Sequence, residues 1–215
     1  MLDEREPATR TEGRRERRRA QTRAALLNAA EHLFHEKGVG GTTVSAVAEL
    51  ADVGYGSFYN YFGTIDDVAR DLAALSIQRT LSRVEEIMSQ ISDDRLLPCI
   101  GARLIIRNLL TDPVIQWMLE RPYILVETFR QQAEPFMQRY EGPALAKGLL
   151  KPVVSHSAWM RTLPWILLSE LTDTVANGNP EDHEESFALI AMRLMGIPDI
   201  DAAILLEKSL AFLPD

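Results

Sequence analysis

Cysteine is almost absent from this chain: among 215 residues, Cys99 is the only one. An intramolecular disulfide framework is therefore excluded. We interpret Cys99 as a small buried apolar residue on a helix, because no histidine partner lies near it in the sequence. Long apolar runs are missing too: no window approaches the ~18 residues of a membrane span, and the N-terminus lacks a signal peptide's apolar segment. We expect a soluble, cytoplasmic protein with no membrane partner.

The motifs of common enzyme sites are also missing. The sequence has no glycine-rich phosphate loop, no nucleophile elbow and no zinc-type cysteine cluster. His32 and His35 are close in the sequence, but two histidines are too few for a metal site. The sequence therefore predicts no enzyme activity, no cofactor and no metal.

The most informative stretch is residues 42–62, which has the pattern of two short helices joined by a tight turn. The first helix is expected to start at Thr43, whose hydroxyl can cap free backbone N–H groups. The turn falls at 52–54, where Asp52 tolerates a left-handed backbone better than most residues. The second helix then runs from Tyr55 to about Phe62. This is the layout of a DNA-reading helix-turn-helix.

The outward side of the second helix carries small, hydroxylated or amide-bearing residues, which suit close approach to phosphates and base edges. Phe58 and Phe62 are expected to point the other way, into the domain. The predicted DNA-binding residues of the motif are Thr43, Gly54, Tyr55, Gly56, Ser57, Tyr59 and Asn60.

Residues 24–74 resemble the N-terminal DNA-binding domain of TetR-family transcriptional regulators. The segment 29–38 looks like the family's first helix and its glycine stop, and 56–62 looks like its recognition-helix signature. The resemblance implies an all-α protein with a three-helix DNA-binding domain and a C-terminal helical domain for ligand binding and dimerisation. It also implies a homodimer on double-stranded DNA, with a palindromic operator. Repression that a small-molecule effector relieves is the family's commoner habit.

Three positions depart from the family pattern. Asp52 stands where the turn usually has glycine, Gly54 where the recognition helix usually has a serine cap, and Ile65 where a basic residue usually holds a phosphate. No lysine or arginine occurs anywhere from Gly38 to Ala69. We therefore expect this protein to hold DNA through cations elsewhere in the chain.

Those cations lie near the start of the chain, although the whole protein has a formal net charge of −8. A basic arm joined to the first helix attracts and orients DNA that an acidic body repels. Residues 1–13, where acidic side chains offset basic ones, are expected to form a disordered leader. The arm residues predicted to contact DNA are Arg14, Arg15, Arg17, Arg18 and Arg19.

The remainder has helical periodicity throughout. The segment 64–67 resembles a capping box and starts a long amphipathic helix to about Ile91. Pro135 is expected to break or kink a later helix, because proline cannot donate a backbone hydrogen bond. We divide the chain into a leader at 1–13, a DNA-binding domain at 14–63 with its motif at 43–62, and a regulatory and dimerisation domain at 64–215.

Two late segments, 157–175 and 180–195, carry apolar stripes wide enough to bury on two sides. One alternative is that both close the monomer's core. We favour the alternative that they also pair with the same helices of a second subunit as a four-helix bundle, because one helix-turn-helix reads only a half-site. The predicted interface residues are Trp159, Leu163, Ile166, Leu167, Leu171, Val175, Phe187, Ile190 and Leu194.

Candidates for an effector pocket are large apolar residues with isolated polar ones among them, which is also the composition of an ordinary core. They are Arg103, Arg107, Trp117, Met118, Tyr123, Glu127, Phe129 and Trp159. Arg103 and Arg107 suit an acidic ligand, but pairing with Glu120 or Glu127 is the structural alternative. Two other functions stay open: a DNA-binding regulator or architectural protein without a ligand, and a helical enzyme or carrier, which the lack of a catalytic constellation disfavours.

Overall fold

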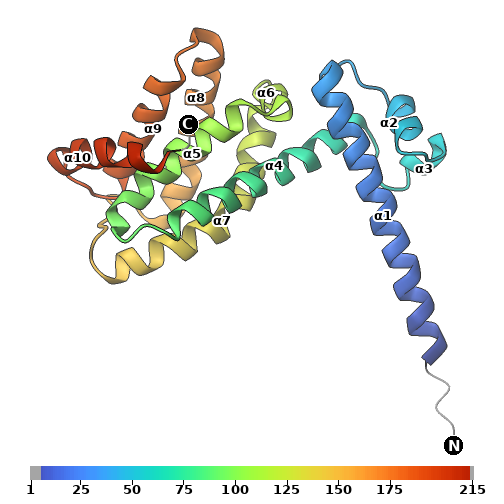
Figure 1. The fold of residues 1–215 in the computed structure, drawn as a ribbon, viewed down its shortest axis with the longest axis horizontal. Helices are drawn as coiled ribbons and strands as arrows, with labels where there is room; N and C mark the ends of the chain where they lie inside the picture. Colours follow the sequence, from blue (N-terminus) through green and yellow to red (C-terminus); the bar gives the residue numbers. More distant parts are fainter. Residues whose placement is uncertain (1–5, 214–215) are drawn as a thin grey trace, which may run out of the picture. The chain divides into compact units, whose positions relative to one another are not determined.

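The computed structural model describes residues 6–213, without the side chains of residues 6–12 and of Glu141. These residues form helices and connecting turns with no strand among them, which confirms the predicted all-α fold. The chain divides into two compact units, Met1–Leu72 and Ala73–Asp215 (Figure 1). The assignment of residues 64–215 to regulation and dimerisation stays a prediction.

The first unit contains α1 (Glu6–Lys37), α2 (Val44–Leu50), α3 (Tyr55–Phe58) and residues 65–72 of α4 (Ile65–Met88). Helices α2 and α3 lie beside the C-terminal half of α1, and the N-terminal half of α1 extends past them (Figure 1). The core is formed by side chains that are fully buried, including Leu26, Phe34, Val47, Phe58 and Val68. Helix α1 stops at the predicted glycine, Gly38, which adopts a left-handed φ of 72°.

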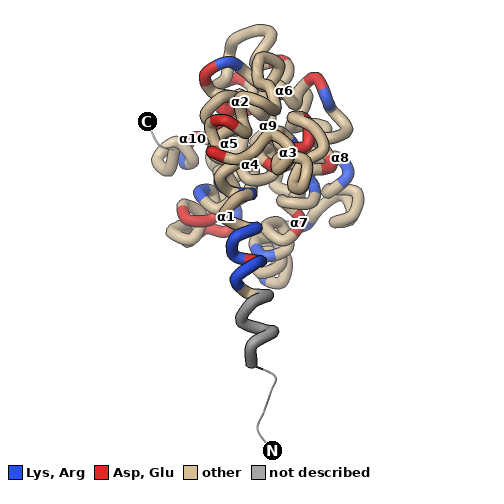
Figure 2. The backbone as a smooth tube through the Cα atoms, turned by 90° about the vertical axis from the view of Figure 1, so that its right-hand side faces the viewer, with Lys and Arg blue, Asp and Glu red and all other residues tan. Residues whose placement is uncertain are grey.

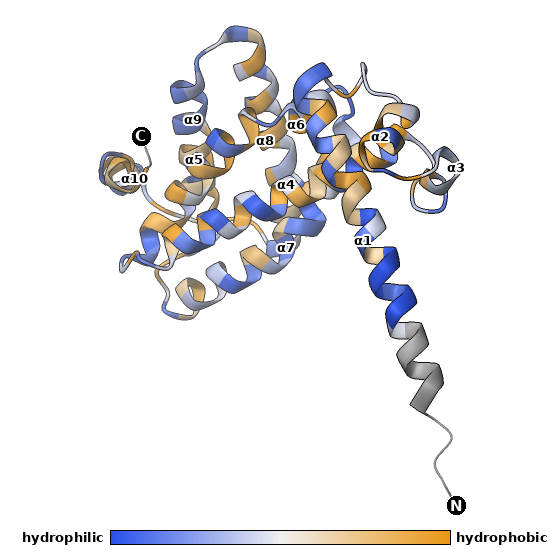
Figure 3. Ribbon diagram, turned by 45° about the vertical axis from the view of Figure 1, so that its right-hand side comes forward, coloured by the Kyte–Doolittle hydropathy of each residue, from blue (hydrophilic) through white to orange (hydrophobic). Residues whose placement is uncertain are grey.

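Helix α1 begins at Glu6, inside the range for which the sequence predicted a disordered leader. Residues 1–5 of that leader lie outside the described residues. From residue 14 to residue 21 every side chain of α1 is exposed, and the first buried side chain after these is that of Leu26. Residues 14–19 of α1 are correspondingly hydrophilic (Figure 3).

The second unit holds residues 73–88 of α4 and the helices that follow it. These are the 3₁₀ turn Asp94–Leu96, α5 (Leu97–Leu110), α6 (Pro113–Met118), α7 (Pro122–Ala146), α8 (His156–Asn177), α9 (Pro180–Leu194), α10 (Asp199–Ser209) and the 3₁₀ turn Leu210–Phe212. Helix α5 is buried on nearly all sides and packs against α9, which also packs on α8. Among the described residues, no helix is long and apolar enough to cross a membrane.

Helix α7 corrects one prediction, because it runs without a break through Pro135 and Pro143. Pro135 donates no backbone hydrogen bond, so the carbonyl of Gln131 loses its helical partner. Gln131 and Pro135 are both exposed, so water can donate to the Gln131 carbonyl and the helix continues.

Two other helices also differ from prediction, one in where it ends and one because no separate helix was assigned there. Helix α3 ends at Phe58 rather than near Phe62, and the chain continues in tighter turns in which Asn60 and Tyr61 donate to carbonyls three residues back. Helix α10 was not predicted, although Ala202, Leu205 and Leu206 are buried at helical spacing after Pro198. Its exposed isoleucines obscure that pattern in the sequence.

Candidate DNA-binding surface and a cavity in the second unit

The helix-turn-helix has the local geometry that its sequence predicted. The Thr43 hydroxyl accepts a hydrogen bond from the Ala46 N–H at 3.2 Å, which confirms it as the N-cap of α2. Asp52 adopts a left-handed φ of 54°, and it is the only non-glycine residue with positive φ in the described chain. The Val53 N–H then bonds the Ala48 carbonyl at 2.9 Å, which closes the turn before α3.

The outer face of α3 and of the two residues that follow it is made of polar but uncharged groups. Tyr55, Tyr59 and Asn60 are exposed, whereas Phe58 is fully buried beneath them. The hydroxyls of Tyr55 and Tyr59 are hydrogen-bonded at 2.9 Å, and their rings meet edge to face with centroids 5.5 Å apart. The hydrogen bond with Tyr55 raises the pKa of Tyr59. Tyr59 therefore presents a neutral hydroxyl at physiological pH.

Two glycines at the start of α3 are not required by the fold. A Cβ on Gly54 would lie 3.6 Å from the Ser57 hydroxyl, which is an ordinary contact, and one on Gly56 would meet nothing within 4 Å. Neither residue has a positive φ. Glycine at these positions therefore leaves room outside the protein, where a DNA backbone can approach closely.

Five arginines lie on the exposed N-terminal half of α1 and form what we call the arginine face: Arg14, Arg15, Arg17, Arg18 and Arg19. At about 100° per residue they occupy about 200° of the helix circumference. Glu16, the acidic residue among them, falls in the remaining arc. Figure 2 shows the resulting block of positive charge on α1. A helix therefore carries the predicted basic arm and concentrates its charge on one side.

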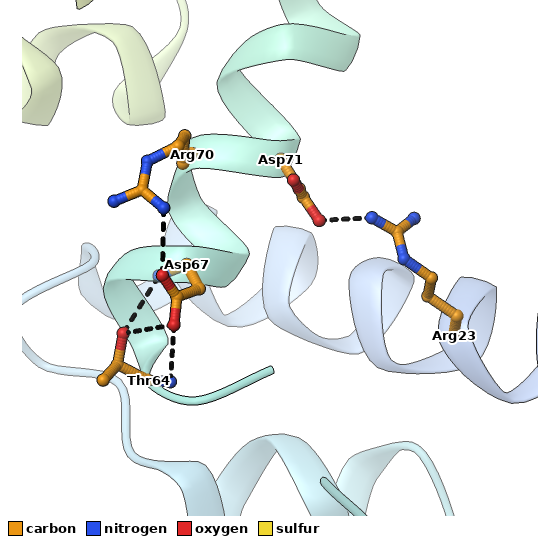
Figure 4. Close-up of polar contacts among 5 residues, drawn as sticks. All are labelled: Arg23, Thr64, Asp67, Arg70 and Asp71. Atoms are coloured by element: carbon orange, nitrogen blue, oxygen red, sulfur yellow. Dashed lines mark hydrogen bonds and ion pairs between the residues drawn. The ribbon is translucent and has the colours of Figure 1, made fainter. Parts of the chain in front are cut away.

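Two arginines close to the helix-turn-helix, Arg23 and Arg70, are held by carboxylates (Figure 4). Arg70 pairs with Asp67 at 3.0 Å, and Arg23 pairs with Asp71 while its guanidinium lies 5.3 Å from the centre of the Phe62 ring. Residues 38–69 contain four acidic residues and no lysine or arginine. The motif is thus acidic, and the arginine face is the concentration of positive charge in this unit.

The start of α4 is fixed by a reciprocal pair of hydrogen bonds, as the capping-box pattern predicted. The Asp67 N–H donates to the Thr64 hydroxyl at 3.1 Å, and the Thr64 N–H donates to the Asp67 carboxylate at 3.0 Å (Figure 4). The Thr64 hydroxyl, followed by Arg70, lowers the pKa of Asp67. Ile65, at the position where the family usually has a cation, is half-buried. This cap sets the direction in which α4 leaves the helix-turn-helix.

The second unit contains an apolar cavity of about 50 Å³. Its walls come from the end of α4 and from α5, α7, α8 and α9, and they include Met88, Gly101, Phe136, Tyr140, Trp159 and Phe187. None of the lining residues that the structure describes is charged. Of the eight predicted pocket residues, Trp159 is the one that the cavity contains.

The other predicted pocket residues have different surroundings. Trp117 lies under the guanidinium of Arg121, and Tyr123 packs edge to face against Trp165. Glu127 pairs with Arg130 on the surface, while Met118 and Phe129 are buried core residues. The lining residue Gly101 carries no signal in the sequence that separates it from an ordinary core residue.

The two arginines of α5 pair with carboxylates of α9. The Nε of Arg107 donates to both carboxylate oxygens of Glu184, at 2.7 and 2.8 Å, and the Glu184 side chain is only 3% exposed. Buried Arg103 lies 3.7 Å from the carboxylate of Glu185. These pairs hold α5 to α9, so the alternative of ion pairing is confirmed in kind, and Arg103 pairs with Glu185 where the sequence offered Glu120 or Glu127.

The predicted dimer residues divide into two groups. Five are buried within this chain: Trp159, Leu163, Leu167, Leu171 and Phe187. Ile166, Ile190 and Leu194 are half-buried, and Val175 is 55% exposed. Most of the predicted interface residues therefore belong to the core of this chain, and only Ile166, Val175, Ile190 and Leu194 are accessible to another molecule.

Comparison with known proteins gives a match for the first unit. Residues 26–72 match the bacterial regulatory proteins of the tetR family. No curated protein matches the chain at a significant level.

Among solved structures, the chain resembles RolR in complex with the ligand resorcinol, with a TM-score of 0.78 and 19% identity over 89% of this chain and 96% of that one. It also resembles the transcriptional regulator FadR from Bacillus subtilis in complex with stearoyl-CoA, with a TM-score of 0.58 and 16% identity over 81% and 98% of the two chains. A gamma-butyrolactone receptor has a TM-score of 0.55 and 17% identity, over 91% and 98% of the chains. At these identities the likeness establishes the shared fold.

Proposed function

We propose that this chain is a transcriptional regulator of the TetR family, which binds a palindromic operator as a homodimer and is released from it by a small molecule. The observation that carries the proposal is the division of roles in the first unit. Helix α3 presents neutral hydroxyl and amide groups, and α1 presents the arginine face. Neutral groups suit the reading of bases, while arginines suit the holding of phosphates.

The tyrosine hydroxyls and the Asn60 amide are the groups that we assign to base edges. An asparagine amide both donates and accepts, which allows a bidentate contact with adenine. Thr43, Ser57 and the open backbone at Gly54 and Gly56 are suited to phosphates, which position the protein without specifying sequence.

The arginine face supplies the attraction that the acidic remainder of the chain lacks. Each arginine that neutralises a phosphate releases counterions, so affinity falls steeply as salt rises. The carboxylate partners of Arg23 and Arg70 reduce what those two residues offer to DNA. We therefore assign most of the sequence-independent binding energy to α1.

A dimer is expected because a single helix-turn-helix contacts only one half-site of a palindromic operator. We assign the interface to the apolar residues of α8 and α9 that the chain leaves partly open: Ile166, Val175, Leu189, Ile190 and Leu194. The α9 members of this set line a shallow groove. A two-fold pairing over this edge leaves the buried stripe as monomer core.

The effector is assigned to the apolar cavity. RolR and FadR were solved with small molecules bound, and they share this fold. In this chain Met88, at the end of α4, forms part of the cavity wall, and α4 starts directly after the helix-turn-helix. A ligand that favours one position of Met88 can therefore bias α4, provided that it binds the two states with different affinity.

The test is binding of the full chain to DNA that flanks its own gene, measured by gel shift at several salt concentrations. We expect saturable, sequence-dependent binding. Replacing the arginine face with five glutamines should weaken binding to every sequence and reduce the salt slope by about one unit for each phosphate that the variant no longer neutralises. Glu16→Gln is the matched control on the same helix and should keep the slope of the unmodified chain.

Sequence-blind binding by the unmodified chain would exclude the regulator function. A full salt slope in the five-glutamine variant would remove the arginine face as a DNA-binding element. If DNA binding holds but no ligand of the cavity releases the complex, the protein is a regulator without an effector.

A further inference from the structure

The lining of the apolar cavity in the second unit includes Trp159, a residue whose buried hydrogen-bond donor has no acceptor. Trp159 lines the cavity and is 3% exposed, and its indole Nε1 has no hydrogen-bond partner among the described residues. Only one other buried side-chain polar atom in the described chain shares this state, Arg103 Nε, and Arg103 does not line the cavity. A buried donor without a partner costs about 1–3 kcal/mol. The indole N–H of Trp159 is therefore the one buried polar group of the described lining residues that lacks a hydrogen-bond partner.

The second polar group in the lining already has a partner. The Tyr140 hydroxyl donates to the Glu85 backbone carbonyl at 3.4 Å, and burial raises the pKa of Tyr140. An indole N–H, unlike a hydroxyl, can only donate. The missing partner must consequently be an acceptor.

Charge is excluded from the ligand by the same lining. The ion pairs between α5 and α9, Arg107 with Glu184 and Arg103 with Glu185, each contain one buried group, and none of these four residues lines the cavity. A charged ligand group would lose its water without gaining an opposite charge, which costs far more than one hydrogen bond returns.

From these features we infer that the cavity takes a compact, uncharged, mainly apolar molecule whose single acceptor oxygen bonds the indole N–H of Trp159. The inference rests on the proposed function, since it names the chemistry of the effector. The present volume of about 50 Å³ is smaller than such a molecule, because an apolar cavity that holds benzene measures about 150 Å³. Met88, Met137 and Met195 line the cavity, and their unbranched side chains adapt readily to make room.

The test compares two probes of nearly the same shape, acetophenone and α-methylstyrene, which differ by a carbonyl oxygen in place of a methylene. Binding to the full chain without DNA is measured by calorimetry, in the unmodified protein and in Trp159→Phe. We expect the ratio of the two affinities to shift toward α-methylstyrene by about fivefold in Trp159→Phe, because one hydrogen bond is lost. Trp165→Phe, which changes a more exposed tryptophan on the same helix, should leave the ratio unchanged.

A second measurement observes the indole N–H of Trp159 in the unmodified protein, and the variant serves only to assign its signal. The chain has three tryptophans, so ¹⁵N spectra contain three indole signals, and Trp159→Phe identifies the one from Trp159. Acetophenone should move that signal downfield in the unmodified protein, and α-methylstyrene should not. Benzoate, which has a similar ring but a negative charge, should not bind.

Three results would each overturn the inference: no saturable binding of acetophenone, an unchanged affinity ratio in Trp159→Phe, or binding of benzoate as tight as that of acetophenone. The proposed function fails separately. If the DNA complex does not form, or forms and ignores acetophenone that occupies the cavity, the ligand chemistry stands and the regulatory mechanism falls.

Discussion

The hydroxyl oxygens of Tyr55 and Tyr59 lie 2.9 Å apart, one turn along the exposed face of α3. One hydroxyl donates to the other, so the pair keeps one free hydrogen to offer to DNA. The bond also orders two side chains that are otherwise free in water, being 56% and 49% exposed. A reading surface ordered in advance loses less entropy on binding than a flexible one.

The first prediction concerns this pair. Tyr55→Phe and Tyr59→Phe should each weaken operator binding by about 1 kcal/mol, the lower end of what a good base contact contributes. The double variant should lose less than the sum, because either single change already breaks the shared hydrogen bond. Fluorescence anisotropy with labelled operator measures all four proteins. Tyr123→Phe, an exposed tyrosine of the second unit, is the control; strict additivity would mean that the two hydroxyls act independently.

Gly56 gives a prediction in which stability and DNA binding move in opposite directions. Alanine at this position meets nothing within 4 Å and has the higher helix propensity, so Gly56→Ala should raise thermal stability slightly or leave it unchanged. If a DNA backbone approaches this face, the added methyl group should lower operator affinity about tenfold (~1.4 kcal/mol). Thermal melting and anisotropy on the same samples check both. Gly13→Ala, where a Cβ also meets nothing, is the control, and unchanged affinity in Gly56→Ala would place DNA away from this glycine.

The sequence predicted the helix-turn-helix in detail because its determinants are local. The Thr43 cap, the left-handed Asp52 and the capping box at Thr64 and Asp67 each depend on residues within four positions of one another. The cavity could not be predicted in this way. It brings Met88 together with Trp159, and an apolar residue of a wall has the same sequence signature as one of a filled core.

The partners of Arg103 and Arg107 show the same limit. The sequence offers Glu120 and Glu127 as nearby carboxylates, but Glu184 and Glu185 are brought to α5 by the packing of α9. Likewise, the late apolar stripes have the same pattern whether they face a second subunit or their own core. In the folded chain Leu171 is buried while Val175, at the next helical position, is not. That difference depends on which helix covers each residue, and the periodicity of the sequence carries no information about it.

The cap of α4 predicts a dependence of stability on pH. Hydrogen bonding by Thr64, aided by Arg70, holds the pKa of Asp67 below its ordinary value of 3.8. The folded state therefore favours the ionised carboxylate, and its stabilisation is present above the unfolded pKa and lost as pH falls through the folded pKa. Asp67→Ala should cost about 1 kcal/mol at pH 7, as for other caps, and much less near pH 3.

Urea unfolding of the full chain at several pH values measures this difference. Thr64→Ala should behave in the same way, and the double variant should cost little more than either single change, because the two side chains bond each other. A cost for Asp67→Ala that stays constant down to pH 3 would show that the ionised carboxylate adds nothing to the cap.

The last prediction separates the two groups of predicted dimer residues. Ile190→Arg combined with Leu194→Arg places two charges on the partly open edge of α9, where the chain itself leaves room for them. If this edge is the interface, the pair of charges should turn a dimer into a monomer in sedimentation, because the two-fold axis brings each charge near its own copy. Operator affinity should then fall far more than binding to a single half-site, since the monomer keeps its reading head but loses the second one. Ile204→Arg, at a residue of α10 that is 48% exposed, is the matched control and should stay dimeric. A dimer that survives the charges on α9 but not the charge on α10 would move the interface to the last helix, and with it the geometry that sets the spacing of the two half-sites.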